Sequence, residues 1–327
     1  MILLAKKPFT ELVKVERLTK KKGNMKSRFF TYLLLFSLVL TSCGPFSLRE
    51  APITVTDGLE KEIQLDAPAS TIISLSPPIT EMLFAIGAGK QVIARDSFSD
   101  YPAEALELPD VGGGFSEYDL ETIVSLKPDL VIAGSINTPE LVQSLEELGL
   151  TVYFLANPAT LEGMLDAIRA LGQVSGHNSE AEELTATLKS RIQAVDDALA
   201  DAAPVSVFYE LDASDPAKPY TPGPGSFYSH LIQRAGGENI GDQLESEWAQ
   251  AGLEFILIAD PEFILLGDAL WGVTPESVAE RPGWDTLSAV KEGRVLPFDD
   301  NLLARIGPRQ VDGLETLVRI LHPEAFE

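Results

Sequence analysis

The amino-acid sequence predicts an α/β protein of two Rossmann-like lobes, with mostly parallel sheets, joined by one long helix. Three observations support this class. Short apolar runs alternate with helical repeats in both halves of the chain, an amphipathic stretch separates the halves, and 327 residues with 45% hydrophobic content can form two cores. Two lobes joined by one helix leave a ligand cleft between them, and ligands of parallel sheets bind beyond the carboxyl ends of the strands.

Composition excludes several classes of protein. The chain has 25 Lys and Arg against 49 Asp and Glu, a net charge of −24, so we expect no nucleic-acid partner, because such partners require a basic face. One Cys excludes a disulfide scaffold and a thiolate metal cluster. We expect a monomer with no metal and no cofactor.

The first 42 residues have the organisation of a secretory signal. Residues 1–28 hold nine basic and two acidic side chains, and the apolar run 29–40 follows. Twelve helical residues reach about 18 Å, too short for a bilayer core of about 30 Å. Met25 would open a compact signal of ordinary length, which suggests that residues 1–24 come from an upstream start codon.

Cys43 lies where a bacterial lipoprotein signal ends, although Thr41 and Ser42 are less usual before the cysteine than Ala and Gly. We therefore expect lipidation of Cys43, with 43–52 as the lipidated N-terminus and linker. The alternatives are a buried free cysteine after an ordinary signal, or a short membrane anchor. Cleavage before Cys43 leaves 16 basic and 47 acidic residues, a net charge of −31. Diacylglycerol with a further acyl chain gives stable anchoring, so the mature protein is expected outside the cytoplasm on a membrane.

Residues 53–177 are predicted to form the first lobe. Asp57-Gly58 between the runs 53–56 and 61–65 indicates a hairpin. Apolar runs predict strands at 71–75, 91–94, 129–133 and 151–155. Helical periods predict helices at 79–86, 120–126 and 139–148.

Residues 178–203 are predicted to be the helix between the lobes. An amphipathic stripe over 161–171 comes first, and Gly172 and Gly176 are predicted to end it. Ser179 and Glu182 have the spacing of a capping box, and the stripe that follows extends toward Pro204. About 22 residues of helix span roughly 33 Å, enough to cross from one lobe to the other.

Residues 204–327 are predicted to form the second lobe, which repeats the order of the first. Strands are expected at 205–211, 262–266 and 294–298, and helices at 227–235, 253–259, 284–290 and 311–321. Residues 127–132 and 259–264 both place Pro between the end of a helix and the start of a strand.

Four segments carry a resemblance to a known family. They are 73–83 (ISLSPPITEML), 126–131 (LKPDLV), 235–240 (AGGENI) and 281–284 (RPGW). Their order and spacing resemble the helix-linked substrate-binding proteins of ABC transporters, the class with periplasmic cobalamin-, ferric-siderophore- and haem-binding members. The resemblance covers residue 53 to the C-terminus.

This resemblance implies partners and docking residues. The partners would be an ABC permease with its ATPase subunits and a small-molecule ligand. One acid on each lobe would dock onto permease arginines. Glu81 matches the first-lobe position, expected as an exposed carboxylate in the first turn of its helix, where it can pair with Arg. The second-lobe position holds His230 instead of an acid; either Glu238 substitutes for it, or the contact is weaker there.

Candidate ligand-binding residues follow the ends of predicted strands. They are Ser76, Pro77, Asp96, Phe98, Tyr101, Phe115 and Ser135 from the first lobe, and Tyr209, Asp212, Tyr220, Phe227, Trp271 and Arg305 from the second. Aromatic rings offer a large contact area at low entropic cost. Tyr101 and Trp271 are preferred because Pro, Asp and Gly surround them, which is typical of loops.

The resemblance is greatest to the cobalamin-binding branch, through residues 97–102, 108–113 and 272–284. Ferric siderophores, often anionic, favour clusters of basic residues, but only Arg95, Arg305 and Arg309 fall in suitable loops. We therefore expect cobalamin, with a ferric siderophore or haem as the alternatives. For haem, Tyr101, Tyr209 or His230 are the candidate iron ligands.

Enzymatic motifs are missing from the sequence. It has no Gly-x-Ser-x-Gly elbow, and residues 87–90 lack the spacing of a phosphate loop. His177, His230 and His322 lack metal-ligand spacing, and His177 and His322 are expected at the surface. The carboxylates Glu210, Asp212 and Asp215 are expected to be solvated loop acids. An extracellular enzyme and a purely structural lipoprotein are the competing classes.

Overall fold

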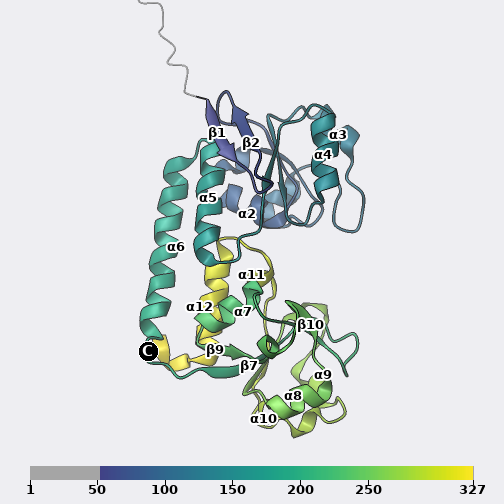
Figure 1. Ribbon diagram of the computed structural model, residues 1–327, viewed down its shortest axis with the longest axis vertical. Coiled ribbons are helices and arrows are strands. Elements are labelled where there is room, and N and C mark those ends of the chain that lie inside the picture. The colour runs from purple at the N-terminus through teal and green to yellow at the C-terminus, as the bar shows by residue number, and fades with distance from the viewer. Residues whose placement is uncertain (1–51, 327) are drawn as a thin grey trace, which may run out of the picture. The chain divides into compact units, whose positions relative to one another are not determined.

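A computed structural model describes residues 52–326, which form two lobes, each built on a four-stranded parallel sheet (Figure 1). The predictions of a signal at 1–42 and of lipidation at Cys43 concern residues outside this part. The predicted fold class is confirmed, since all neighbouring strands within each four-stranded sheet run parallel.

The first-lobe sheet has the strand order β4-β3-β5-β6. Its strands are β3 (Ile72–Ser74), β4 (Val92–Arg95), β5 (Leu130–Gly134) and β6 (Val152–Leu155). The predicted hairpin is present as β1 (Ile53–Thr56) and β2 (Glu62–Leu65). Asp57 closes its turn, because one carboxylate oxygen accepts from the backbone N–H groups of Leu59 and Lys61.

The first-lobe helices begin where polar caps or proline predict a start. They are α2 (Pro77–Ala85), α3 (Leu120–Ser125) and α4 (Pro139–Glu147), with short 3₁₀-helices η1 (Ala88–Gln91) and η2 (Ala103–Glu107). The Asp119 carboxylate accepts from Thr122 N–H and the Thr138 hydroxyl from Leu141 N–H, so side chains satisfy the free amides at both helix starts.

Two long helices follow, α5 (Leu161–Ser175) and α6 (Asn178–Ala198). The prediction that Gly172 ends the first helix is wrong. Gly172 lies inside α5 at a close approach to α6, where a Cβ would lie 2.6 Å from the Ala181 Cβ. Gly176 does end α5, in the left-handed conformation at φ 80°.

The start and end of α6 also differ from the prediction. The prediction of a capping box formed by Ser179 and Glu182 is wrong, because the N-cap is His177 and no side chain caps the helix. The helix ends at Ala198, before Pro204 is reached. Its buried face, with Leu188, Ile192 and Val195, follows the predicted stripe.

Because Gly172 permits the contact between α5 and α6, we predict that Gly172→Ala lowers the free energy of unfolding by about 1–2 kcal/mol, the steric cost outweighing the helix propensity gained. Chemical denaturation measures this. Gln173→Ala, on the exposed side of α5, is the control and should change stability by less than about 0.5 kcal/mol. Equal stability of the two variants would contradict the close packing at Gly172.

The second-lobe sheet has the strand order β12-β11-β7-β9. Its strands are β7 (Val205–Glu210), β9 (Gly237–Asn239), β11 (Phe263–Leu266) and β12 (Val295–Pro297). The prediction did not include β9 or the antiparallel ribbon of β8 (Tyr220–Pro222) and β10 (Trp248–Gln250). At three residues each, these strands are too short to produce a recognisable alternation.

Most second-lobe helices are short. They are α7 (Phe227–Arg234), η3 (Ile240–Gln243), α8 (Leu253–Ala259), η4 (Gly267–Trp271), α9 (Pro275–Ala279), η5 (Trp284–Thr286), α10 (Ser288–Lys291), α11 (Asn301–Ala304), α12 (Arg309–Leu321) and η6 (Pro323–Phe326). The helix predicted at 284–290 is two pieces, η5 and α10. Leu287 between them is extended, at φ −66° and ψ 143°, and this break allows both Trp284 and Leu287 to be buried.

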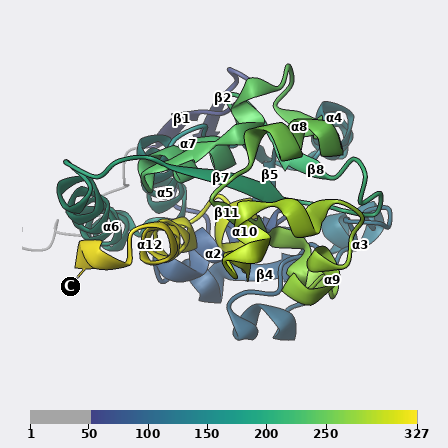
Figure 2. The ribbon, with the colours of Figure 1, turned by 90° about the horizontal axis from the view of Figure 1, so that it is seen from below.

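The C-terminal helix α12 ties the second lobe to α6, and the two helices lie side by side (Figures 1 and 2). Its apolar stripe, including Leu314, Leu317 and Leu321, is buried in a hydrophobic core that also takes in residues of α2, α5 and α6. On the outer side, Arg191 of α6 donates to Asp312 at 2.6 Å and to Glu315 at 2.8 Å. One continuous core therefore connects the two lobes on the side of α6.

Within residues 52–326, none of the helices combines the length and the apolar character needed to cross a membrane.

Candidate ligand-binding site

The carboxyl ends of the parallel strands in the two lobes meet in one region. Asp100 follows β4 of the first lobe, and Arg305 follows β12 and α11 of the second. The Arg305 guanidinium donates to the Asp100 carboxylate, so loops from both sheet edges are in contact. In parallel α/β sheets this is the edge that binds ligands.

Buried polar side chains order the first-lobe loop in this region. The Thr80 hydroxyl donates to Ser74 Oγ at 2.8 Å and lies 2.8 Å from Ser99 Oγ, and Ser99 donates to Asp96. Burial raises the pKa of Asp96, while the hydrogen bonds that its carboxylate accepts from the Ser99 hydroxyl and the Phe98 N–H oppose the rise. The Asp96 carboxylate is buried and accepts from Phe98 N–H in the turn that leads to Tyr101, so ligand contact by Asp96 stays a prediction that requires this turn to open.

Five residues from the two lobes form what we call the interlobe cluster: Glu81, Asp100, Tyr101, Arg305 and Arg309. Arg309 at the start of α12 donates from Nε and Nη2 to the two carboxylate oxygens of Glu81, at 2.8 and 2.6 Å. Arg305 lies 3.5 Å from the same carboxylate. The Arg309 guanidinium stacks over the Tyr101 ring, 4.0 Å from its centroid.

The expectation that Glu81 is exposed in the first turn of its helix is wrong. Glu81 lies in the second turn of α2 and is only 3% exposed. Its bidentate pairing with Arg309 replaces the water that a buried carboxylate loses. In this conformation the Glu81 carboxylate is already occupied, so docking on a permease remains a prediction that requires this pair to separate.

Large aromatic side chains are exposed at the carboxyl-terminal edges of both sheets. Phe115 is 99% exposed, with its ring edge-on to Phe98 at 5.2 Å between centroids. Trp271, at the end of the 3₁₀-helix after β11, is 86% exposed, and Tyr101 and Tyr220 are about half exposed. Exposed aromatic rings cost free energy in water, so these four side chains are candidates for contact with a partner.

A pocket lies at the carboxyl ends of the neighbouring strands β7 and β11, and we call it the second-lobe pocket. Its volume is about 400 Å³. This lies within the range of about 300–1,000 Å³ that is typical of small-molecule sites. The lining residues are Leu211, Asp212, Ala213, Ser214, Asp268, Trp271 and Val273. Two predicted ligand contacts, Asp212 and Trp271, therefore share one pocket.

Beneath this pocket lies a buried group of two acids and an arginine. Arg281 donates to both oxygens of Glu210, at 2.6 and 2.8 Å, and the Glu210 side chain is completely buried. Glu210 is thus not the solvated loop acid that was predicted. Burial, followed by the charge of Glu210, raises the pKa of Asp268 to about 7. Asp268 accepts from Ala213 N–H at 3.1 Å and so holds the pocket loop.

The raised pKa of Asp268 predicts a pH-dependent stability. The folded protein binds one proton more than the unfolded chain between the ordinary carboxyl pKa of 3.8 and about 7, so this stabilisation is present at pH 4 and is lost as pH rises through 7. We expect the wild-type melting temperature to fall from pH 5 to pH 8 by more than that of Asp268→Asn. Asp215→Asn, at an exposed acid, is the control. Parallel pH profiles for wild type and Asp268→Asn would exclude this assignment.

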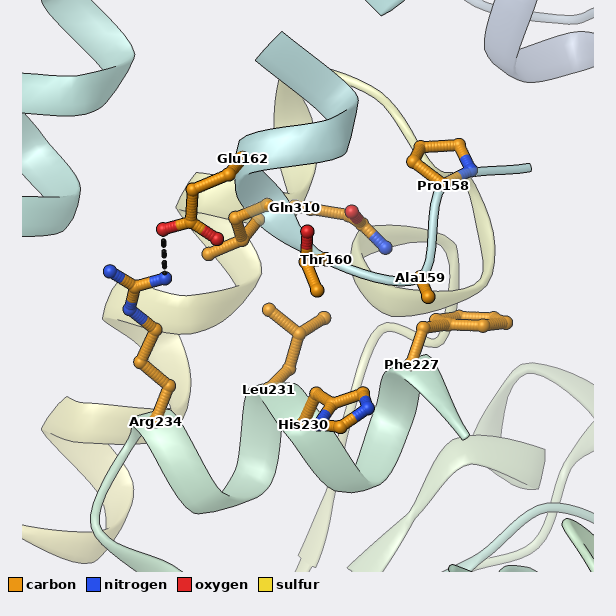
Figure 3. A pocket seen from close by; sticks show the side chains of 10 residues that line it. Pro158, Ala159, Thr160, Glu162, Phe227, His230, Leu231, Arg234 and Gln310 are labelled. Atoms are coloured by element: carbon orange, nitrogen blue, oxygen red, sulfur yellow. Dashed lines mark hydrogen bonds and ion pairs between the residues drawn. The ribbon is translucent and has the colours of Figure 1, made fainter. Parts of the chain in front are cut away.

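A second pocket lies between the start of α5 and α7 (Figure 3). Its lining includes Thr160, the N-cap of α5, and Glu162 of α5, then Phe227, His230 and Arg234 of α7, and Gln310 of α12. Arg234 links the two sides through an ion pair with Glu162 at 2.7 Å. Its volume of about 160 Å³ lies below the range of typical small-molecule sites. His230 and Phe227 therefore lie together, but away from the second-lobe pocket.

Other predicted contacts are buried. Tyr209 is part of the core. Its hydroxyl donates to the Asp300 carboxylate at 2.9 Å, and the Tyr228 hydroxyl donates to the same oxygen. Burial holds the pKa of Tyr209 well above its ordinary value. Ser76 and Pro77 are buried at the start of α2. All three side chains are buried here, so ligand contact by them stays a prediction that requires them to become accessible.

The remaining predicted residues lie as follows. Ser135 is exposed and accepts from Asn157 N–H at 2.7 Å, joining the ends of β5 and β6. Glu238 is exposed on the edge strand β9. His322, expected at the surface, is buried, with Nε2 3.1 Å from the Gly236 carbonyl oxygen. Asp215 is exposed, as predicted.

Sequence reasoning missed Asp268 and Asp100 and did not assign Arg309 a contact. Asp268 lies two residues after the apolar run of β11, and a carboxylate shortly after a buried strand is a sequence signal that could have identified it. For Arg309 no local signal exists, because its partner Glu81 is 228 positions away in the chain. Among the described residues, no group of three His, Cys, Asp or Glu side chains could hold a metal ion.

Two α/β lobes, joined through α6 and meeting at a strand edge lined with aromatic rings, define the class of two-lobed ligand-binding proteins. Comparison with known protein families supports this class. The chain belongs to the periplasmic binding protein family, which matches residues 72–302.

Individual relatives support the same assignment. YvrC, an ABC transporter substrate-binding lipoprotein of Bacillus subtilis, is 27% identical over 93% of this chain and 100% of its own length. The crystal structure of the vitamin B12-binding protein BtuF of Vibrio cholerae has a TM-score of 0.68 and 30% identity, covering 80% of this chain and 99% of that one. The haem-binding protein RhuT of Roseiflexus sp. RS-1 has a TM-score of 0.69 and 28% identity, covering 79% and 99%.

These relatives are substrate-binding proteins and not enzymes, which supports a non-enzymatic role for this chain in ABC import. The family is periplasmic or extracytoplasmic. The predicted class is thereby confirmed, while the relatives include binders of both vitamin B12 and haem.

Proposed function

We propose that this protein captures a corrinoid such as cobalamin between its lobes, outside the cytoplasm, and delivers it to an ABC permease driven by separate ATPase subunits. Lipidation of Cys43 would hold it on the membrane. One observation carries the choice of ligand: the facing strand edges present exposed aromatic rings, while the nearby arginines are already paired. Such a surface favours a large ligand with little net charge.

The pairing of the arginines disfavours an anionic ferric siderophore. Arg95 is buried, and its guanidinium donates to the carbonyl oxygens of Ala105 and Asp96. Arg305 pairs with Asp100, and Arg309 is held by Glu81. An anionic ligand would have to break these pairs, in a chain whose acidic charge already repels anions at long range.

Haem is the second candidate, favoured by the similarity to RhuT. Haem capture commonly uses a protein side chain as an axial ligand to iron. Of the three predicted ligands, Tyr209 is unsuited, because its hydroxyl is buried against Asp300. Tyr101 and His230 remain, whereas cobalamin carries its own axial base and needs no such residue.

The same geometry sets a condition for the proposed handover to the permease. For Glu81 to pair with a permease arginine, Arg309 must first release it, and the exposed His230 and Glu238 are the second-lobe candidates. Charge attraction between an acidic binding protein and such arginines should make docking faster at low salt.

A thermal-shift comparison tests the ligand class. At equal concentration we expect cyanocobalamin to raise the melting temperature most, because a ligand present at about 100 times its Kd stabilises the folded state by about 2.7 kcal/mol. Haemin and an anionic ferric catecholate should produce smaller shifts. If haemin gave the largest shift, haem would replace cobalamin as the proposed ligand. If the catecholate gave the largest shift, the paired arginines would have to separate from their carboxylates to bind an anion.

A further inference from the structure

The interlobe cluster joins helices from opposite lobes through a buried charge pair. Glu81 belongs to α2 of the first lobe and Arg309 to α12 of the second, and their bidentate contacts measure 2.6 and 2.8 Å. We propose that Glu81 and Arg309 form a latch that holds the lobes together and must open for the cleft to open.

Burial ties this contact to the arrangement of the lobes seen in the structure, which we call the closed arrangement. The Glu81 side chain is 2% exposed, and the Arg309 and Arg305 side chains are 17% and 16% exposed. A carboxylate without a partner in such a place is strongly disfavoured, whereas both groups regain water when they separate. The closed arrangement therefore depends on both members of the pair being present.

Two further contacts also hold the two lobes together. The Tyr101 ring packs against the Arg309 guanidinium, and Asp100 pairs with Arg305, so the first-lobe loop after β4 is also held by the second lobe. This loop is itself ordered by the buried network of Thr80, Ser99 and Asp96. Opening the latch thus frees Tyr101, a predicted ligand contact, together with Glu81.

The consequence for ligand exchange rests on the proposed function. If the ligand binds between the lobes, its escape requires the latch to open, and a weakened latch should speed dissociation. The latch itself does not depend on the identity of the ligand, so lobe separation can be measured in the ligand-free protein.

The test is a double-mutant cycle in which the distance between the lobes is measured for each variant. Spin labels are placed at Gln143→Cys on α4 and Glu254→Cys on α8, both exposed, in the full chain with Cys43→Ser. Double electron–electron resonance then gives the populations of short and long distances for the labelled wild type, Glu81→Gln, Arg309→Met and the combined variant. Circular dichroism confirms that each variant is folded.

We expect Arg309→Met to raise the ratio of open to closed molecules by about 100-fold or more, because the closed form would bury a carboxylate that has lost both short hydrogen bonds and keeps only Arg305 at 3.5 Å. Glu81→Gln should shift it in the same direction. The combined variant, without either charge, should return to within about threefold of the wild type, and this rescue distinguishes a latch from general damage. Arg191→Met, which removes a more exposed arginine paired with α12, is the control and should leave the distances unchanged.

Unchanged distances in folded Arg309→Met would overturn the latch, as would a combined variant as open as the single ones. These outcomes are separate from failure of the proposed function. If the variants open as expected but neither they nor the wild type bind cyanocobalamin, the latch stands and the ligand proposal falls.

Discussion

Replacing Arg281 with methionine should lower the free energy of unfolding by about 3–5 kcal/mol, the usual cost of removing one partner from a buried ion pair. The Glu210 side chain is completely buried, and Arg281 supplies hydrogen bonds to both of its oxygens. Arg281 also stacks on Trp284, 4.7 Å from the ring centroid, so methionine is chosen to keep much of this apolar packing. Urea denaturation, monitored by tryptophan fluorescence, measures the loss.

Two control variants separate the buried charge from other effects. Arg319→Met removes a side chain that is 60% exposed and lies in a surface ion pair, and should cost less than about 1 kcal/mol. The combined variant Glu210→Gln and Arg281→Met removes both charges of this ion pair and should recover part of the stability. A single Arg281→Met variant as stable as the wild type would contradict the burial of Glu210.

Replacing Trp271 with alanine should weaken corrinoid binding by about 30-fold, equivalent to about 2 kcal/mol, the threshold of a dominant interface residue. Trp271 is 86% exposed and borders the second-lobe pocket, so its ring has little packing to lose within the fold. The free energy of unfolding should therefore remain nearly unchanged. Titration of cyanocobalamin into both proteins compares the affinities.

Ile258→Ala provides the matched control for Trp271→Ala. Ile258 is 78% exposed on α8 but is not among the residues that line the second-lobe pocket. Its removal should leave affinity within about twofold of the wild type. Equal affinities of Trp271→Ala and wild type for cyanocobalamin would place the ligand away from this pocket.

The alternation of apolar runs and helical repeats was sufficient to predict both lobes and the helix between them. These patterns reflect local geometry and burial, so β3, β5, β7 and α6 lie close to their predicted positions. Features that depend on contact across the structure were not predictable in this way. In the sequence Gly172 resembles a residue that ends a helix. In the structure it lies inside α5, and its missing side chain lets α5 and α6 approach closely.

Charged residues show the same limit at the candidate site. Glu81 and Glu210 were predicted to be solvated, because isolated acids in a sequence usually lie at the surface. Both are buried, since arginines 228 and 71 positions away in the chain pair with them. Aromatic residues in Pro- and Gly-rich loops were more informative, and Tyr101 and Trp271 are indeed exposed at strand ends.

Isothermal titration calorimetry with cyanocobalamin measures directly whether the lobes bind a corrinoid. We expect one ligand to bind per chain with a submicromolar Kd, more tightly than haemin or a ferric siderophore. Absence of cyanocobalamin binding by a folded sample that binds haemin or a siderophore would contradict the choice of ligand. Absence of binding to all three would contradict the proposed capture of these ligands altogether.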